Sequence, residues 1–170
     1  GWAMEGAVGS NNKIDATYLS PHVNNAARMM AACKQYNVHM LMNGDVQELA
    51  SNEGKSMLRH VDTVIVKGSS VPNKLYTFDC KSKGVQFFMN SRSENTANQE
   101  ACNFNENCWR IDKDLLNMSR HATDKFRESF EIGRVLYEKG MWNESIDALE
   151  NANDIMRKSH EDAGWDEENE

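Results

Sequence analysis

Asn24 and Arg28 are the residues of this chain whose types and spacing best suit chemistry. They lie four residues apart in a stretch that the sequence predicts to be a helix, so their side chains share one helix face. An amide and a guanidinium on one face suit a charged, oxygen-rich ligand such as a triphosphate. The same spacing is also typical of a solvated polar pair, so the neighbouring residues must decide between the two interpretations.

The helix that carries this pair has a clear start. Ser20 followed by Pro21 is a typical beginning, because serine caps the first turn and proline fits the first helical position. We expect the helix to continue to about Tyr36. Its predicted apolar stripe consists of Val23, Ala26, Ala27, Met30 and Cys33.

The rest of the first eighty residues alternates between strands and helices. Small apolar residues at 2–8 predict a buried strand, and residues 9–12 predict a turn. Further along we expect a strand at 39–42, a short helix at 45–50, a strand at 58–67, a turn at 68–72 and a strand at 74–80. The last two strands form a hairpin, so the fold class is α+β.

Bulk properties exclude some function classes. The chain has 170 residues, a net charge of -7 and a mean hydropathy of -0.72. The acidic balance argues against nucleic-acid binding. No run of about 18 apolar residues occurs, so we expect no membrane span in this segment.

The cysteines and histidines show no metal-ligand spacing, so we assign no metal ligand within the chain. Cys33 and Cys80 fall on predicted secondary structure and are expected to be buried thiols. This usage indicates a reducing compartment.

The second half of the chain is different in composition. Residues 81–112 predict a polar linker, residues 113–159 a helical hairpin, and residues 160–170 an acidic tail. One predicted apolar face comprises Phe126, Phe130, Ile132, Gly133, Leu136 and Tyr137, and the other Ile146, Leu149, Ala152 and Ile155. The hairpin resembles a single tetratricopeptide-like unit, which cannot bury both faces alone, so we expect it to pack on the first domain or on a partner.

Residues 1–80 contain a series of motifs: G-W-A-M-E-G-A-V-G-S from Gly1, Y-L-S-P followed by V-N-N-A-A-R, A-A-C-K-Q-Y-N-V-H-M-L-M, and H-V-D-T-V-I-V-K-G-S-S-V-P-N-K-L-Y-T-F-D-C ending at Cys80. Together they resemble the class III nucleotidyl cyclases, in the order in which that family has them. The resemblance implies that residues 1–80 form the C-terminal half of a ferredoxin-like cyclase domain, an antiparallel sheet with helices. The other half, with two aspartates that hold Mg²⁺ or Mn²⁺, would precede Gly1 in a longer protein.

The resemblance also implies a role for each candidate residue. Arg28 matches the arginine that stabilises the transition state, and Asn24 matches the asparagine that orients the ribose. Lys67 matches the lysine that reaches the terminal phosphates, although a solvated lysine beside a hairpin is the plain alternative. Thr17 matches the position that contacts the purine base, and threonine there favours ATP over GTP. A loop threonine with no ligand is the alternative for Thr17.

The function implied is second-messenger synthesis, the conversion of ATP to cyclic AMP and pyrophosphate. The active site would form between two cyclase domains in a head-to-tail dimer, on the cytoplasmic side of a membrane-anchored parent protein. This segment alone would be inactive without the metal-binding half. The alternatives are a non-catalytic cyclase-like module for assembly, with the helical tail docking a partner, and a guanylyl cyclase acting on GTP.

Overall fold

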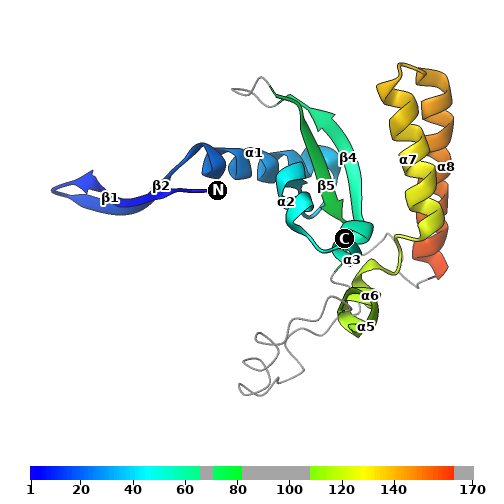
Figure 1. Cartoon of the computed structure of the whole chain (residues 1–170), viewed down its shortest axis with the longest axis horizontal. Helices are drawn as coiled ribbons and strands as arrows, with labels where there is room; N and C mark the ends of the chain where they lie inside the picture. The colour runs from blue at the N-terminus through cyan, green and yellow to red at the C-terminus, as the bar shows by residue number, and fades with distance from the viewer. Residues whose placement is uncertain (66–70, 82–107, 163–170) are drawn as a thin grey trace.

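The computed structural model describes residues 1–65, 71–81 and 108–162. An arm of two strands lies at one end of the molecule, a small sheet with helices lies in the middle, and a pair of long helices lies at the other end (Figure 1). The elements are β1 (Met4–Ser10), β2 (Lys13–Leu19), α1 (Pro21–Tyr36), β3 (Met42–Asn43), α2 (Gly44–Leu49), α3 (Asn52–Met57), β4 (Leu58–Val64), β5 (Asn73–Phe78), α5 (Cys108–Ile111), α6 (Lys113–Ser119), α7 (Asp124–Glu138) and α8 (Trp142–Asp162). The α+β class is therefore confirmed.

The arm is an antiparallel hairpin of β1 and β2, paired from Met4 with Leu19 to Ser10 with Lys13. A strand was predicted at its start, but the prediction that this strand is buried is wrong, because every residue of β1 is exposed. Its small apolar residues suggested that other segments pack on both faces of the strand. Among the described residues, however, β1 pairs only with β2, and both faces of this hairpin are exposed to solvent. The second strand was not predicted.

Helix α1 begins and ends as predicted, but a different face is buried. Met29 is the buried residue of the helix, whereas Met30, predicted in the apolar stripe, is 73% exposed. The last residue of the helix helps to turn the Met29 side toward the sheet, because the Tyr36 hydroxyl donates to Asp62 Oδ2 of β4 at 2.6 Å. Burial and this carboxylate both raise the pKa of Tyr36.

The central sheet has the order β3-β5-β4, and both pairings are antiparallel. The predicted β4–β5 hairpin is confirmed. The short helix predicted at 45–50 is also confirmed as α2, which is capped by Asn43. The strand predicted at 39–42 is shorter than expected and pairs only at Met42 and Asn43. Helix α3 was not predicted. Lys67 and residues 68–70 of the predicted turn lie outside the described residues.

The predicted helical hairpin is formed by α7 and α8, which contact each other through small residues. A Cβ atom on Gly133 would lie 2.7 Å from Leu149, so the helices approach too closely there for a larger residue. The Ser145 hydroxyl donates to the Gly133 carbonyl at 2.9 Å. The predicted apolar faces were too wide, because Ile132 and Ile146 are more than half exposed and Tyr137 is half exposed. Only the side facing the partner helix or the sheet is covered.

The boundaries predicted after residue 80 are only partly described. Most of the predicted linker, 82–107, lies outside the described residues, but α5 occupies its last residues as a short helix. Helix α8 continues to Asp162, into the predicted acidic tail, whose residues 163–170 lie outside the described residues.

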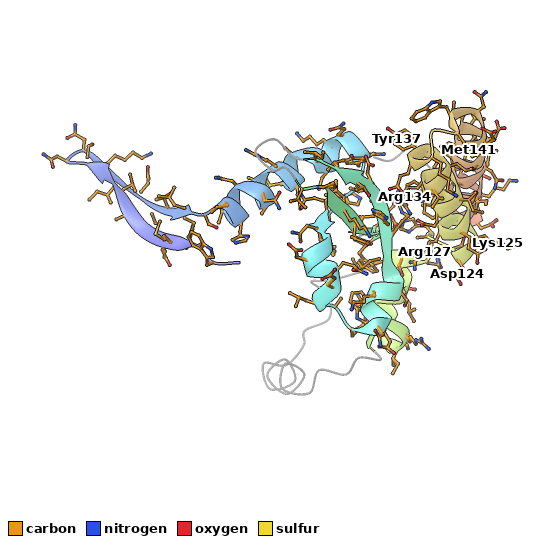
Figure 2. The ribbon with its side chains drawn as sticks, turned by 45° about the horizontal axis from the view of Figure 1, so that its top comes forward. Asp124, Lys125, Arg127, Arg134, Tyr137 and Met141 are labelled. Carbon is orange, nitrogen blue, oxygen red and sulfur yellow. The ribbon has the colours of Figure 1, made fainter. Side chains whose placement is uncertain are left out.

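The hairpin packs on the sheet through α7, as expected for a single helical unit. Arg127 and Arg134 lie on the side of α7 toward the sheet (Figure 2), and Arg127 donates to the Ser56 carbonyl at 3.2 Å. The Thr63 hydroxyl of β4 donates to Glu138 at 3.1 Å. These contacts join segments that lie about seventy residues apart in the sequence.

Arg59 and Asp79 form the most buried ion pair of this junction. Arg59 Nε donates to Asp79 Oδ2 at 2.7 Å, and Nη2 donates to Oδ1 at 2.5 Å. The two side chains are 11% and 7% exposed. The guanidinium also lies 4.3 Å from the ring centre of Phe130 and 5.2 Å from that of Phe126. The pair therefore connects β4, the end of β5 and α7.

His121 and His160 line the same cavity as this pair, with ring centres 5.2 Å apart. His121 is only 4% exposed. Burial, together with the nearby His160, lowers the pKa of His121 to about 4. The folded chain therefore favours the neutral form of His121.

We expect Asp79→Ala to lower the free energy of unfolding by about 3–5 kcal/mol, because it leaves the Arg59 charge buried without its carboxylate. Asp15→Ala is the matched control, since it breaks the exposed Lys13–Asp15 pair and should cost about 1 kcal/mol or less. Urea unfolding followed by circular dichroism measures both. Equal losses in the two variants would contradict the role given to the buried pair.

We expect the folded chain to lose about 1–2 kcal/mol of stability between pH 7 and pH 5 through His121. Its folded pKa of about 4 lies below the ordinary value of 6.5, so the stabilisation is present above pH 6.5 and is lost as the pH falls toward 4. His121→Gln should remove that part of the pH dependence, whereas His39→Gln, at an exposed histidine, should not. Unfolding curves at several pH values test this; identical pH profiles for the two variants would argue against it.

Candidate functional site

The candidate site is the exposed side of α1. Asn24 lies in the first turn, where its backbone N–H donates to the Ser20 carbonyl at 3.1 Å, and Arg28 lies one turn later. Both side chains are exposed. In the part of the chain that the structure describes, neither side chain forms a hydrogen bond or an ion pair. The amide and the guanidinium are thus presented together, as the spacing predicted.

The start of α1 is fixed by Ser20, which is buried. Its hydroxyl accepts from the His22 backbone N–H at 3.0 Å and donates to the Trp2 carbonyl at 2.6 Å. The rings of Trp2 and His22 meet edge to face, with centres 6.2 Å apart. The residues just before β1 are therefore attached to the first turn of α1, directly beside Asn24.

The other two predicted residues are less closely linked to this pair. Thr17 lies on β2, half-buried and opposite Gly6 of β1, three residues before the capping Ser20. It forms no hydrogen bond to Asn24 or Arg28 among the described residues. Lys67 lies outside the described residues, so its predicted role stays a prediction.

The opposite side of α1 is different in chemistry. Counting 3.6 residues per turn, the side chains of Ala26, Met29 and Cys33 lie on the side of the helix away from Asn24 and Arg28. These residues line an open groove of about 580 Å³ between α1 and the β3–α2 segment. The helix therefore has one apolar side toward the rest of the domain and one polar side toward solvent.

The described residues contain no cluster of three or more histidine, cysteine or acidic side chains that suits a metal ion. The candidate residues themselves, Thr17, Asn24, Arg28 and Lys67, are neutral or basic. Such groups can orient and neutralise a phosphorylated ligand.

A second group of polar residues was not singled out from the sequence. Arg59, Asp79, His121 and His160 meet at the junction of the sheet and the helical hairpin. Arg59 pairs with Thr77 in the β-ladder, so Asp79 is its diagonal neighbour on the same face, and a known register would have predicted their contact. The two histidines lie 39 residues apart, and no local spacing indicates that they meet.

Comparison of this chain with family models, with curated proteins and with solved structures finds no match. Separately, none of the described helices combines the length and the apolar character that crossing a membrane requires.

Because α1 presents the candidate pair, its capping residue is a direct test of how the site is built. We expect Ser20→Ala to lower the free energy of unfolding by about 1 kcal/mol or more, since the variant loses the cap and the bond to Trp2. Ser20→Thr keeps a hydroxyl and should lose less. Urea unfolding compares the two variants, and a larger loss in Ser20→Thr than in Ser20→Ala would show that the cap does not hold this turn.

Proposed function

We propose that this chain supplies the nucleotide-positioning half of a class III nucleotidyl cyclase active site, which converts ATP to cyclic AMP and pyrophosphate. The observation that carries the proposal is the joint presentation of Asn24 and Arg28 on the exposed side of one capped helix. The flanking motifs from Gly1 to Cys80 resemble that family, and the antiparallel sheet with helices suits half of a ferredoxin-like domain.

The proposed reaction is attack of the ribose 3′-hydroxyl oxygen on the α-phosphorus, with pyrophosphate as the leaving group. Negative charge grows on the phosphoryl oxygens in the transition state, and the fixed planar charge of Arg28 suits those oxygens. The Asn24 amide suits the ribose, which must be held so that the attack is in line. Mg²⁺ or Mn²⁺, held by aspartates upstream of Gly1 in the proposal, would lower the pKa of the attacking hydroxyl and neutralise phosphate charge.

Exposure of the pair supports a site shared between two protein domains. Asn24 and Arg28 have no partner among the described residues, so both side chains are open to a ligand, to a second domain or to solvent. In the proposal their partners are the nucleotide and a second cyclase domain in a head-to-tail dimer. We place the purine base near Thr17, whose hydroxyl suits the adenine amino edge, and so propose ATP rather than GTP.

We expect Arg28→Ala in the full parent protein to lower kcat for cyclic AMP formation by about a hundredfold or more. The Michaelis constant for ATP should change by about threefold or less, because the lost contact is made mainly in the transition state. The measurement is steady-state synthesis of cyclic AMP from ATP with Mn²⁺, repeated with GTP to compare the two bases.

Lys34→Ala is the matched control, because Lys34 is an exposed basic residue in the last turn of the same helix. It should leave kcat within about twofold of the parent. If Arg28→Ala keeps full activity, the catalytic role of Arg28 is refuted. If the parent protein makes no cyclic nucleotide and has no pair of metal-binding aspartates upstream, the non-catalytic assembly module is the better description.

A further inference from the structure

A second cavity lies where the helical hairpin meets the sheet, and neither Asn24 nor Arg28 lines it. Its volume is about 600 Å³, within the range of about 300–1,000 Å³ typical of sites for small molecules. One wall is the end of β5 and the residues after it, and the opposite wall is the inner side of α7 and α8. The segment after α1, at residues 37–39, closes a third side. Arg59 of β4 and His121, just before α7, complete the lining.

The base of the cavity is apolar and well packed. Phe126 and Ala152 are buried at 5% and 1% exposure, and Phe130 and Met156 pack against them. All four side chains line the cavity. A ligand that occupies it would therefore bury an apolar ring or chain against these residues.

The rim of the cavity is basic, although the chain as a whole carries a net charge of -7. Among the described residues that line it, Asp79 is the single acidic one, and its carboxylate already accepts from Nε and Nη2 of Arg59. Lys81 and Arg157 add two further positive charges. Arg157 also lies 2.8 Å from Asp154, but that pair is 55% exposed on both sides and is screened by water.

The histidines add to the excess of basic over acidic residues at the cavity. His121 and His160 both line the cavity, and their rings approach each other there. Burial and their mutual proximity lower the pKa of His121. A bound anion would oppose that effect, since a nearby negative charge favours the protonated form of His121.

We propose that this cavity binds a small amphiphilic anion, with its apolar body on Phe126, Phe130 and Met156 and its charged group toward Lys81, Arg157 and the two histidines. Carboxylate and phosphate head groups share this chemistry. Since the walls belong to the sheet and to the hairpin, the bound molecule holds the two together. The proposal is independent of the cyclase function, because none of these residues belongs to the site on α1.

The test uses the full chain and two fluorescent probes that differ only in charge. 1-Anilinonaphthalene-8-sulfonate carries a sulfonate on an aromatic body, and N-phenyl-1-naphthylamine is the same body without it. We expect the sulfonate probe to bind with one-to-one stoichiometry and at least about tenfold more tightly than the neutral probe. Equal affinity for both probes, or several equivalent sites per chain, would overturn the proposal, because either would indicate general adsorption on apolar surface.

Variants then locate the probe. Arg157→Gln should weaken binding of the sulfonate probe about five- to tenfold. Lys158→Gln, which also removes one positive charge but at the next residue, outside the cavity, should alter it by about twofold or less. Asn153→Trp adds bulk at an exposed lining position and should abolish binding. Circular dichroism verifies that each variant is folded. If folded Asn153→Trp binds the probe like the parent chain, the cavity is not the site.

Competition distinguishes the two head groups. Decanoate and 1-naphthyl phosphate are added in turn to the probe complex, with 1-decanol as the uncharged control. Displacement by the carboxylate, by the phosphate or by both supports the proposal and identifies the preferred group. Displacement by 1-decanol as effectively as by decanoate contradicts it, because the charge would then contribute nothing.

Discussion

The buried ion pair between Arg59 and Asp79 is the contact on which the arrangement of this chain depends. Removing two charges from water costs free energy, and a close, bidentate hydrogen-bonded geometry is needed to offset that cost. Here the geometry is met, because Nε and Nη2 of the guanidinium each donate to one carboxylate oxygen. The flat face of Arg59 is also used, because it lies over the rings of Phe126 and Phe130. One side chain therefore joins neighbouring strands and fixes the hairpin on them.

The same logic explains why α1 has a defined orientation although little of it is buried. At its start, Ser20 bonds both to the first turn and to the Trp2 carbonyl. At its end, the Tyr36 hydroxyl bonds to Asp62, which also accepts from the Thr63 N–H at 2.7 Å. The helix is thus held at both ends by hydrogen bonds rather than by a broad apolar face. That arrangement leaves the side with Asn24 and Arg28 open to solvent.

How much of this could be predicted from the sequence depends on the range of each interaction. The start of α1 was predictable because Ser20 and Pro21 act within one turn, and the α7–α8 hairpin was predictable from its periodicity. The exposed face of α1 was not, since Met29 and Met30 are equally apolar and the buried face depends on contacts distant in sequence, such as that of Tyr36 with β4. The prediction that β1 is buried was wrong for the same reason, because burial depends on which distant segments pack against the strand. The strand β2 carried a usable signal, because Ile14, Ala16 and Tyr18 alternate with polar residues.

The candidate pair and the cavity at the hairpin share one element. The first turns of α1 carry Asn24 and Arg28, and Tyr36 with the residues after it lines the cavity. A helix of 16 residues is about 24 Å long and moves as a nearly rigid rod. Lying on one helix does not by itself couple the two sites energetically. Coupling requires two conformations of the chain that ligands at the two sites favour to different extents. The contact of Tyr36 with Asp62 is the place where such a difference would arise, since its loss would free the end of α1 from β4 while leaving the cap at Ser20 intact.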